Sequence, residues 1–595
     1  MIKKYYPYII LAAGFAVLFF RAFYSFCWSD ESFYFSTAWR FYQGDSIFRH
    51  DWFPTQLSGV ILLPFLSLYL AFSHGSAEGL LLYFRLLYLL FSFGSSVAAF
   101  RILKKHFGEL PALASALCVL FYAHLNIATL SYYTISVQCF FLAQLNIYHW
   151  EKLGQLNRRV SLRYLILAGF FYALSVLALP TMVVGYVLTL LIFVILSLVS
   201  KINPSTAFSA GVRKAELFVV WKYTFFGILL PAVLFFVFLL TNVSIPDFIQ
   251  NIPYVLTDEE HGTSLVYPMK KFFIGINEVY GRFAHLGYLL ILICFGIAVY
   301  QALRSNSRLI LFVIDILLFI AYFIKGFGHT GYIQTALCLT ALPLFFLTRE
   351  RDYAAFFTFF VNGLVFSLVY SYSSNGYLYI LAMGHFIASI AGIKFIVDFV
   401  KENLEAPALS SGLAQAVRTL CVLVLLSVTL ETMVLRVINI YRDAPFSELT
   451  EKIEEGPAKG LYTTKKHLDL YKEVYDTLIT DCQSDTADSI FISKLLPWGY
   501  LCTDLRVGAP TTWRTELGSE RLREYYELNP DRIPDLVLVL NEEYGTYDTC
   551  GDVEADPNPN AQEKPEGFLT EYMAENDYKV RQVSCGTLYI NPGKN

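Results

Sequence analysis

The chain has 595 residues, of which 56% are hydrophobic and only 16% are charged. Soluble globular domains carry roughly 25% charged residues, so this composition excludes an ordinary soluble protein and indicates a polytopic membrane protein. The formal net charge of -4 offers no basic surface for nucleic acid.

The first apolar segment, at about 7–24, follows Lys3 and Lys4. Secretory signals also begin this way, but here the run ends in RAFYSFCW, which offers no small-residue cleavage site. We therefore predict a retained first membrane span rather than a cleaved signal.

The segment after this span, residues 28–54, concentrates ionisable side chains in a chain that is otherwise mostly apolar. These are Asp30, Glu31, Asp45, His50 and Asp51. An acidic pair directly at a span exit, followed by an aromatic run, indicates a site rather than a simple polar loop. The run FYFSTAWRFYQG is typical of a helix lying in the headgroup layer.

Twelve further segments are apolar enough, at about 20 residues each, to predict spans. They lie at about 80–100, 110–125, 132–148, 163–179, 181–200, 217–241, 284–302, 308–325, 332–347, 353–372, 377–398 and 418–438. Together with the first span they predict about 13 transmembrane helices.

The apolar run at about 56–72 could be a span or a helix lying in the interface. If it does not cross, the basic connectors all fall on the side of Lys3 and Lys4, as the positive-inside rule expects. Residues 25–79, the loop 242–283 and the tail then lie outside. We therefore predict a multi-pass protein of the cell membrane with its site on the outer face.

The tail, residues 439–595, regains charged residues, Gly and Pro. Short strand-like runs such as SIFISKLL alternate with helical ones such as SERLREYYEL, which predicts an extracytoplasmic α/β domain after a transmembrane domain over 1–438. Four cysteines of the tail could pair in an oxidising compartment: Cys482, Cys502, Cys550 and Cys585.

The order of these elements resembles the GT-C glycosyltransferases, which include the protein O-mannosyltransferases and the aminoarabinose transferases of lipid A. The features that carry the resemblance are a first span, an outer loop opening with Asp30 and Glu31, and Pro54 before an apolar interfacial run. The span count and the outer C-terminal domain extend it over nearly the whole chain.

The resemblance implies a GT-C fold, a sugar donor linked to a polyprenyl phosphate, and a bacterial membrane. It implies that Asp30 is the general base and that Glu31 orients it or the acceptor. The sequence departs from the family pattern at Tyr132 and Tyr133, where relatives often carry a second acid, and no lysine precedes Pro54. The oligosaccharyltransferase signature WWDYG is also missing; PWGY at 497–500 is only faintly similar.

Further residues are candidates for substrate binding. Arg85 is the first candidate to bind the donor phosphate, because a guanidinium can donate two parallel hydrogen bonds to phosphate oxygens. A cation at a helix end can also simply extend to the membrane–water interface without binding a ligand. The loop around TDEEHGTS could help bind a divalent metal, but we favour a solvated loop and expect no cofactor. The full candidate set is His50, Asp51, Arg85, Tyr132, Tyr133, Glu259, His261, Lys325 and His329.

The sequence thus predicts an inverting glycosyltransferase that moves a sugar to a hydroxyl of a glycan, lipid or protein acceptor among the membrane lipids. The alternative from another class is a transporter or flippase of lipid-linked sugars. A transporter is expected to carry ionisable residues near the middle of the bilayer, and in this sequence Asp315 is the one predicted there. An oligosaccharyltransferase-like enzyme and a catalytically inactive scaffold also stay open.

Overall fold

The structure is a computed structural model. It describes residues 2–153, 158–202, 214–256, 266–282, 285–286, 289, 292–293, 296–297, 308–328, 332–373, 377–404, 411–483, 486–513, 515, 517–541, 544 and 567–593.

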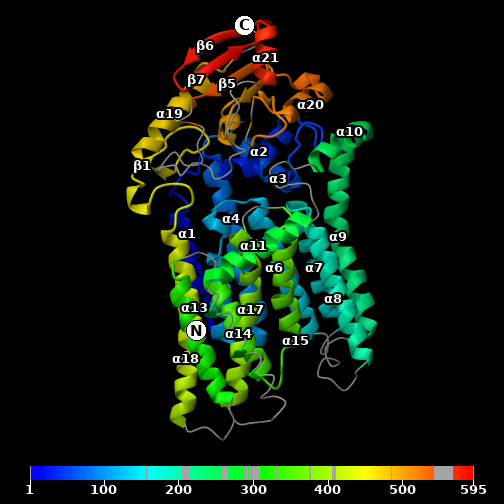
Figure 1. Cartoon of the computed structure of the whole chain (residues 1–595), viewed down its shortest axis with the longest axis vertical. Helices are drawn as coiled ribbons and strands as arrows, with labels where there is room; N and C mark the ends of the chain where they lie inside the picture. Colours follow the sequence, from blue (N-terminus) through cyan, green and yellow to red (C-terminus); the bar gives the residue numbers. More distant parts are fainter. Residues whose placement is uncertain are drawn as a thin grey trace.

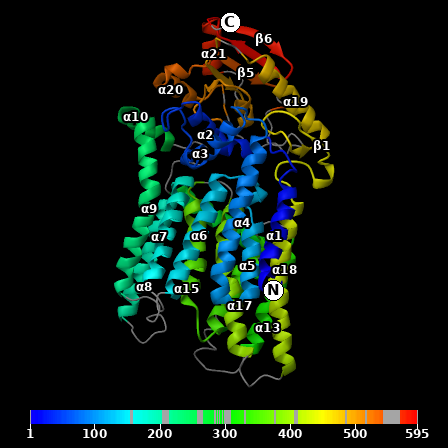
Figure 2. The ribbon, with the colours of Figure 1, turned by 180° about the vertical axis from the view of Figure 1, so that it is seen from behind.

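A bundle of long apolar helices forms the larger part of the protein (Figure 1). Its members are α1 (Ile2–Arg21), α4 (Leu80–Phe107), α5 (Glu109–Phe121), α6 (Tyr132–Leu153), α7 (Arg158–Ala178), α8 (Met182–Ile202), α9 (Lys214–Asn242), α13 (Arg308–Gly326), α14 (Tyr332–Leu347), α15 (Tyr353–Ala355) with the π-helical η3 (Phe356–Val361) and α16 (Asn362–Tyr370), α17 (Tyr377–Leu404) and α18 (Ser411–Ile438). A helix covers every predicted span except 284–302, where only scattered residues are described. In both views, α1 and α18 run side by side along one edge of the bundle (Figure 2).

Six of the described helices are long and apolar enough to cross a membrane by themselves. Others are too short to cross it alone: α14 coincides with the predicted segment 332–347 but has 16 residues, about 24 Å of helix at 1.5 Å per residue, against a hydrocarbon core of about 30 Å. The mostly helical membrane fold is confirmed, while the count of 13 spans stays a prediction.

Two short helices lie between the bundle and the C-terminal domain (Figure 1). They are α2 (Asp30–Tyr42) and α3 (Leu57–Phe72), which pack on each other. Gly59 permits this contact, because a Cβ there would lie 2.7 Å from Thr37 Cγ2. Two further helices are α10 (Ile245–Leu256), which follows α9 at this end, and α11 (Val266–Arg282), which packs against α17 of the bundle. We call the end of the bundle next to the C-terminal domain the sheet end.

The C-terminal domain contains a five-stranded sheet of order β4-β3-β5-β7-β6. Strand β3 (Ser489–Ile492) is parallel to β4 (Arg506–Val507) and β5 (Leu536–Leu540), whereas β7 (Gly586–Ile590) is antiparallel to β5 and β6 (Lys579–Val583). The remaining elements are β1 (Glu451–Lys452), β2 (Tyr462–Thr463), α19 (Lys465–Thr480), α20 (Glu520–Leu528), α21 (Phe568–Glu575) and the short η4 (Phe446–Glu448), η5 (Pro497–Cys502) and η6 (Pro530–Arg532). The predicted sheet-containing tail is confirmed. Cys482, Cys502 and Cys585 are free thiols, and Cys550 lies outside the described residues.

The segment after α1 is buried beneath this domain rather than exposed as a loop. Phe26 lies 5.2 Å from Tyr471 and Trp28 lies 5.3 Å from Trp498, measured between ring centroids. The backbone N–H of Ser25 donates to the carbonyl of Tyr462 at 2.9 Å. The apolar core of the C-terminal domain therefore continues into α2, α3 and the start of α4.

Candidate active site

The acidic pair opens α2: Asp30 is its first residue and Glu31 its second. Carboxylates are favoured in the first turn of a helix, where the macrodipole is positive. Both side chains are nevertheless buried, with Asp30 8% and Glu31 3% exposed. Buried carboxylates need compensating partners, and each of the two has a different set.

Asp30 is held by a cation and two phenols. Tyr34 donates to Oδ1 and Tyr441 donates to Oδ2, each at 3.1 Å. Arg442 forms an ion pair with Oδ2 and also donates to Ser29 Oγ at 2.9 Å. Arg442 adopts a left-handed backbone conformation with φ of +49°, which is uncommon for a residue other than glycine. The chain thus turns sharply after α18 and presents Arg442 to Asp30.

Glu31 is held by Arg85 from α4. The Nε of Arg85 lies 3.1 Å from both carboxylate oxygens of Glu31. Its Nη1 donates to the carbonyl of Ala22 at 2.8 Å, and its Nη2 donates to that of Ser25 at 3.0 Å. The predicted phosphate ligand is therefore engaged with Glu31 and with the residues that follow α1.

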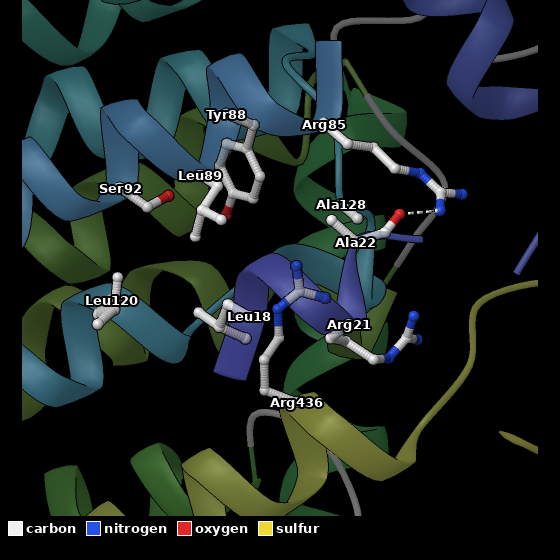
Figure 3. Close-up of a pocket in the computed structure, with 10 residues that line it drawn as sticks. All are labelled: Leu18, Arg21, Ala22, Arg85, Tyr88, Leu89, Ser92, Leu120, Ala128 and Arg436. Carbon is white, nitrogen blue, oxygen red and sulfur yellow. Dashed lines mark hydrogen bonds between the residues drawn. The ribbon is translucent and has the colours of Figure 1, made fainter. Parts of the chain in front are cut away.

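A small pocket beside this pair is lined by three arginines from three helices. Figure 3 shows Arg21 of α1, Arg85 of α4 and Arg436 of α18, with Arg436 extending toward Tyr88. Arg21 donates to the carbonyls of Val437 and Asn439 at 3.0 and 3.1 Å. Arg436 donates to the carbonyl of Asn126 at 2.8 Å.

The three arginines around this pocket carry a surplus of positive charge, although only the guanidinium of Arg436 lies among its apolar lining residues in Figure 3. Within the described part of the chain, neither Arg21 nor Arg436 has a carboxylate within 4.0 Å, so Glu31 is the one acid paired with the three guanidinium groups. The pocket volume is about 20 Å³, enough for about one water molecule. An anion would be attracted here, and a large one would require the helices to separate.

Tyrosines fill the space on the other side of Asp30. The ring of Tyr34 lies 5.3 Å from that of Tyr132 and 5.9 Å from that of Tyr133. Tyr133 in turn lies 5.7 Å from Tyr370 at the end of α16 and 4.7 Å from His124 in η1 (His124–Asn126). The structure thus brings the predicted Tyr132 and Tyr133 next to the acidic pair.

His50 and Asp51 lie elsewhere, in a buried network between the first loop and the C-terminal domain. Asp45 at its centre is 2.7 Å from Arg40 Nε and 2.6 Å from Arg532 Nη1. Arg532 also donates to Nδ1 of His50 at 2.9 Å. Asp51 accepts from the hydroxyl of Thr37 and from a backbone N–H.

The charges of this network follow from its burial. Burial lowers the pKa of His50 to about 3, so the imidazole is neutral. Burial alone would raise the pKa of Asp45, but Arg40 and then Arg532 bring it below its usual value. Burial raises the pKa of Asp51 despite the proximity of Arg40.

The remaining predicted residues fall outside this arrangement or outside the described chain. Lys325 is exposed at the end of α13. Glu259, His261 and His329 lie outside the described residues. Among the residues that are described, no group of three or more His, Cys, Asp or Glu side chains is arranged to hold a metal ion.

Sequence reasoning missed Tyr34, Tyr441, Arg442 and Arg436. The sequence did contain one signal for Arg436 and Arg442. Both lie at the outer end of the last span, and the positive-inside rule predicts few cations on the outer side. Cations placed there against the rule are candidates for a functional role.

Solved structures share this fold, although no protein-family model and no curated protein sequence matches the chain. The archaeal oligosaccharyltransferase AglB from Archaeoglobus fulgidus, in complex with an inhibitory peptide and a dolichol-phosphate, is 12% identical and covers 99% of this chain and 75% of its own, with a TM-score of 0.50. A second AglB structure, tethered to an acceptor peptide, has a TM-score of 0.49 at 12% identity over 99% and 74% of the two chains. ArnT from Cupriavidus metallidurans in the apo state has a TM-score of 0.46 at 11% identity and covers 98% of each chain.

The first match carries the fold assignment. AglB is a GT-C glycosyltransferase, so the GT-C fold expected from the order of elements is confirmed. At this level of identity the likeness concerns the fold alone, and function must be argued from the site.

Proposed function

We propose that the chain is a membrane glycosyltransferase that moves a sugar from a polyprenyl-phosphate donor to an acceptor hydroxyl at the sheet end. The observation that carries this proposal is the buried Asp30 at the start of α2, fixed by Tyr34, Tyr441 and Arg442. A carboxylate fixed in this way suits a general base, whose position must be set within hydrogen-bond reach of the proton it removes.

The proposed step is a single displacement. Asp30 takes the proton of the acceptor hydroxyl, whose oxygen forms a bond to the anomeric carbon of the donor sugar. The bond from that carbon to the phosphate oxygen breaks, and the polyprenyl phosphate leaves with the electron pair. Attack opposite the leaving group inverts the anomeric centre.

The three arginines would stabilise the leaving phosphate. Arg21 and Arg436 donate to backbone carbonyls and have no acidic partner among the described residues. Fixed cations aimed at developing negative charge are a large source of catalysis. In this conformation the guanidinium of Arg85 is paired with Glu31. We therefore propose that donor binding opens the pocket and that the donor phosphate and Glu31 then both bind Arg85. His50 and Asp51 would support the site by fixing the loop rather than by touching the sugar.

The charge distribution along the bundle supports an extracytoplasmic sheet end in a bacterial membrane. Cations gather toward the opposite end of the helices: Arg101, Lys104 and Lys105 lie in the last two turns of α4, Lys152 in the last turn of α6 and Lys401 in the last turn of α17. Short connectors rich in Lys and Arg stay in the cytoplasm. The C-terminal domain would then face the periplasm or cell exterior.

A second candidate is an oligosaccharyltransferase-like activity, which the likeness to AglB favours. Such an enzyme transfers a whole glycan to a peptide. The two candidates differ in donor and acceptor, so competing labelled substrates separate them.

The test is transfer of label from a polyprenyl-phosphate hexose to cell-envelope acceptors in proteoliposomes. Asp30→Asn should lower the rate by at least about 100-fold, the lower end of general acid–base effects, while Asp469→Asn on the exposed face of α19 should leave it unchanged. Label appearing on peptide from a glycan pyrophosphate lipid instead would establish the second candidate. Wild type that moves the labelled lipid between leaflets without transfer would replace the proposal with a transporter.

A further inference from the structure

Helix α10 carries an exposed apolar stripe, although it is too short to span a membrane. It has 12 residues, about 18 Å of helix. Ile245, Ile249 and Leu256 are 62%, 64% and 76% exposed, and at 3.6 residues per turn they lie within about 40° of one another around the helix axis. We call these three residues the α10 stripe. A contiguous exposed apolar surface marks contact with a membrane or with another protein.

The opposite side of α10 is fixed to the rest of the protein. Asn251 is 2% exposed, and its Oδ1 accepts from the Nε1–H of Trp52 at 3.0 Å. The ring of Tyr254 stacks on that of Trp52, with 4.5 Å between the centroids. Arg521 of α20 donates to the carbonyls of Trp52 and Tyr254 at 3.1 and 3.0 Å. The first loop and the C-terminal domain therefore hold one side of α10 and leave the α10 stripe uncovered.

No charge interrupts the stripe. Asp247 is the one charged residue of α10, and at 100° per residue it lies about 160° around the axis from Ile249. It forms an ion pair with Arg49 of the first loop at 3.7 Å and accepts from the hydroxyl of Ser244. The charged and the apolar sides of α10 are thus separated, as in helices that lie at a membrane surface.

The preceding helix places α10 relative to the bilayer. The sequence has no Asp, Glu, Lys or Arg between Lys222 and Asp247, and exposed apolar residues of α9 continue up to Leu240. From Lys222 to Leu240 the helix rises about 27 Å, close to the hydrocarbon thickness of about 30 Å. Because an exposed lysine extends toward the headgroups, the hydrocarbon ends near the end of α9, where α10 begins.

The neighbouring α3 carries a similar stripe. It contains no charged residue, and its Phe65, Leu68 and Phe72 are exposed. In both views α3 and α10 lie near α2, at the sheet end of the bundle (Figure 1 and Figure 2). Two exposed apolar stripes at the same end of the bundle indicate that a lipid surface meets the protein there.

We propose that α10 lies in the headgroup layer of the leaflet at the sheet end, with the α10 stripe inserted among the lipids. Amphipathic helices bind membranes in this way, with the apolar face buried about 5–10 Å at the boundary of headgroups and acyl chains. The bilayer is the occupant that the position favours, because the stripe continues the lipid-facing surface of α9.

Insertion of α10 would set the height of the first loop above the lipids. Through Trp52 and Arg521 it would hold that loop and the C-terminal domain at a fixed distance from the bilayer, the level at which a lipid-linked molecule presents its polar end. Insertion does not depend on the proposed function, since α10 would bind lipid whether or not the chain transfers a sugar.

The experiment measures the depth of a nitroxide spin label in the full chain, in nanodiscs of phosphatidylcholine. Oxygen concentrates in lipid, whereas a water-soluble nickel chelate stays in water, so relaxation of the label by each agent reports its surroundings. A label at Ile249→Cys should be relaxed by oxygen. It should lose most of the relaxation by the chelate that a label at Asp469→Cys shows on the exposed face of α19.

Two controls accompany this measurement. Gln250→Cys is also exposed but lies about 100° further around α10, so its label should keep more of the relaxation by the chelate than the label at Ile249→Cys. Labelled wild type gives the signal of the native cysteines, which is subtracted. Equal thermal unfolding midpoints establish that the variants fold.

Equal relaxation of the Ile249→Cys and Asp469→Cys labels by the chelate would place α10 in water and overturn the proposal. Protection of the Ile249→Cys label from both agents would also overturn it, because a second copy of the chain would then cover the stripe. Asp30→Asn should abolish transfer and leave the depth of the label unchanged, so failure of the proposed function and failure of lipid insertion are distinguishable.

Discussion

Arg85 joins Glu31 through two oxygens at once, with its Nε 3.1 Å from each of them. The same guanidinium donates to the carbonyls of Ala22 and Ser25. One side chain of α4 therefore fixes the end of α1 and the start of α2, and with them the position of the neighbouring Asp30.

Glu31→Gln tests this arrangement. It leaves Arg85 buried without its carboxylate, and breaking one partner of a buried ion pair costs about 3–5 kcal/mol. We expect a clearly lower thermal unfolding midpoint in detergent micelles. Glu109→Gln, which breaks the exposed pair with Lys104, should change the midpoint little. Equal midpoints for the two variants would show that the buried pair does not stabilise the fold.

Arg442 should act through Asp30. Arg442→Gln removes the cation from a buried carboxylate, and because a hydrogen bond to a charged group is worth about 1.5–3 kcal/mol, we expect kcat of sugar transfer to fall about ten- to a hundredfold. Arg442→Lys should recover part of the loss because it restores the charge without the guanidinium fork.

The control for Arg442 is Arg523→Gln on the exposed face of α20, which should leave kcat unchanged. An Arg442→Gln protein with normal kcat and a raised KM would mean that Arg442 binds substrate rather than positioning the base.

The helices were predictable because each is a local run of apolar residues whose length and composition suffice. The helix at 30–42 and the strands at 489–492 and 536–540 also follow from local patterns. The site was only partly predictable: the acidic pair, Arg85 and the two tyrosines of α6 stand out as polar groups at the ends of apolar runs.

The partners of those residues could not be read from sequence. Asp30 and Arg442 are 412 residues apart, and Asp45 meets Arg532 only because the C-terminal domain folds back over the first loop. No periodicity encodes such contacts. His50 and Asp51 stay predicted substrate-binding residues, and the structure places them in the network with Arg532 and Arg40, a placement that the sequence did not predict.

Asp45 should be the main connection between the first loop and the C-terminal domain. Asp45→Asn leaves Arg40 and Arg532 buried with too little negative charge, at a cost of about 3–5 kcal/mol. We expect faster limited proteolysis between the bundle and the C-terminal domain. Asp531→Asn, which is half-exposed, should be cleaved like wild type; equal cleavage of both variants would argue against this role for Asp45.

His50 should make the stability of the protein sensitive to acid. Its Nδ1 accepts from the backbone N–H of Ser46 at 2.8 Å and from Arg532 at 2.9 Å, so that nitrogen carries no proton in the folded chain. The pKa of His50 is about 3 when folded and 6.5 in its usual state. Between these values the unfolded chain binds a proton that the folded chain does not.

The free energy of unfolding should therefore be highest, as far as His50 is concerned, above about pH 6.5 and should fall by up to about 1.4 kcal/mol per pH unit toward pH 3. His50→Asn keeps a side-chain acceptor but cannot be protonated, so its unfolding midpoint should fall less than that of wild type between about pH 7 and about pH 5. His74→Asn, at an exposed position, should behave as wild type. The lowered pKa of Asp45 changes the free energy of unfolding only at more acidic pH, and it is common to all three proteins. An identical pH dependence of the unfolding midpoint in wild type and His50→Asn would therefore show that His50 is protonated in the folded chain.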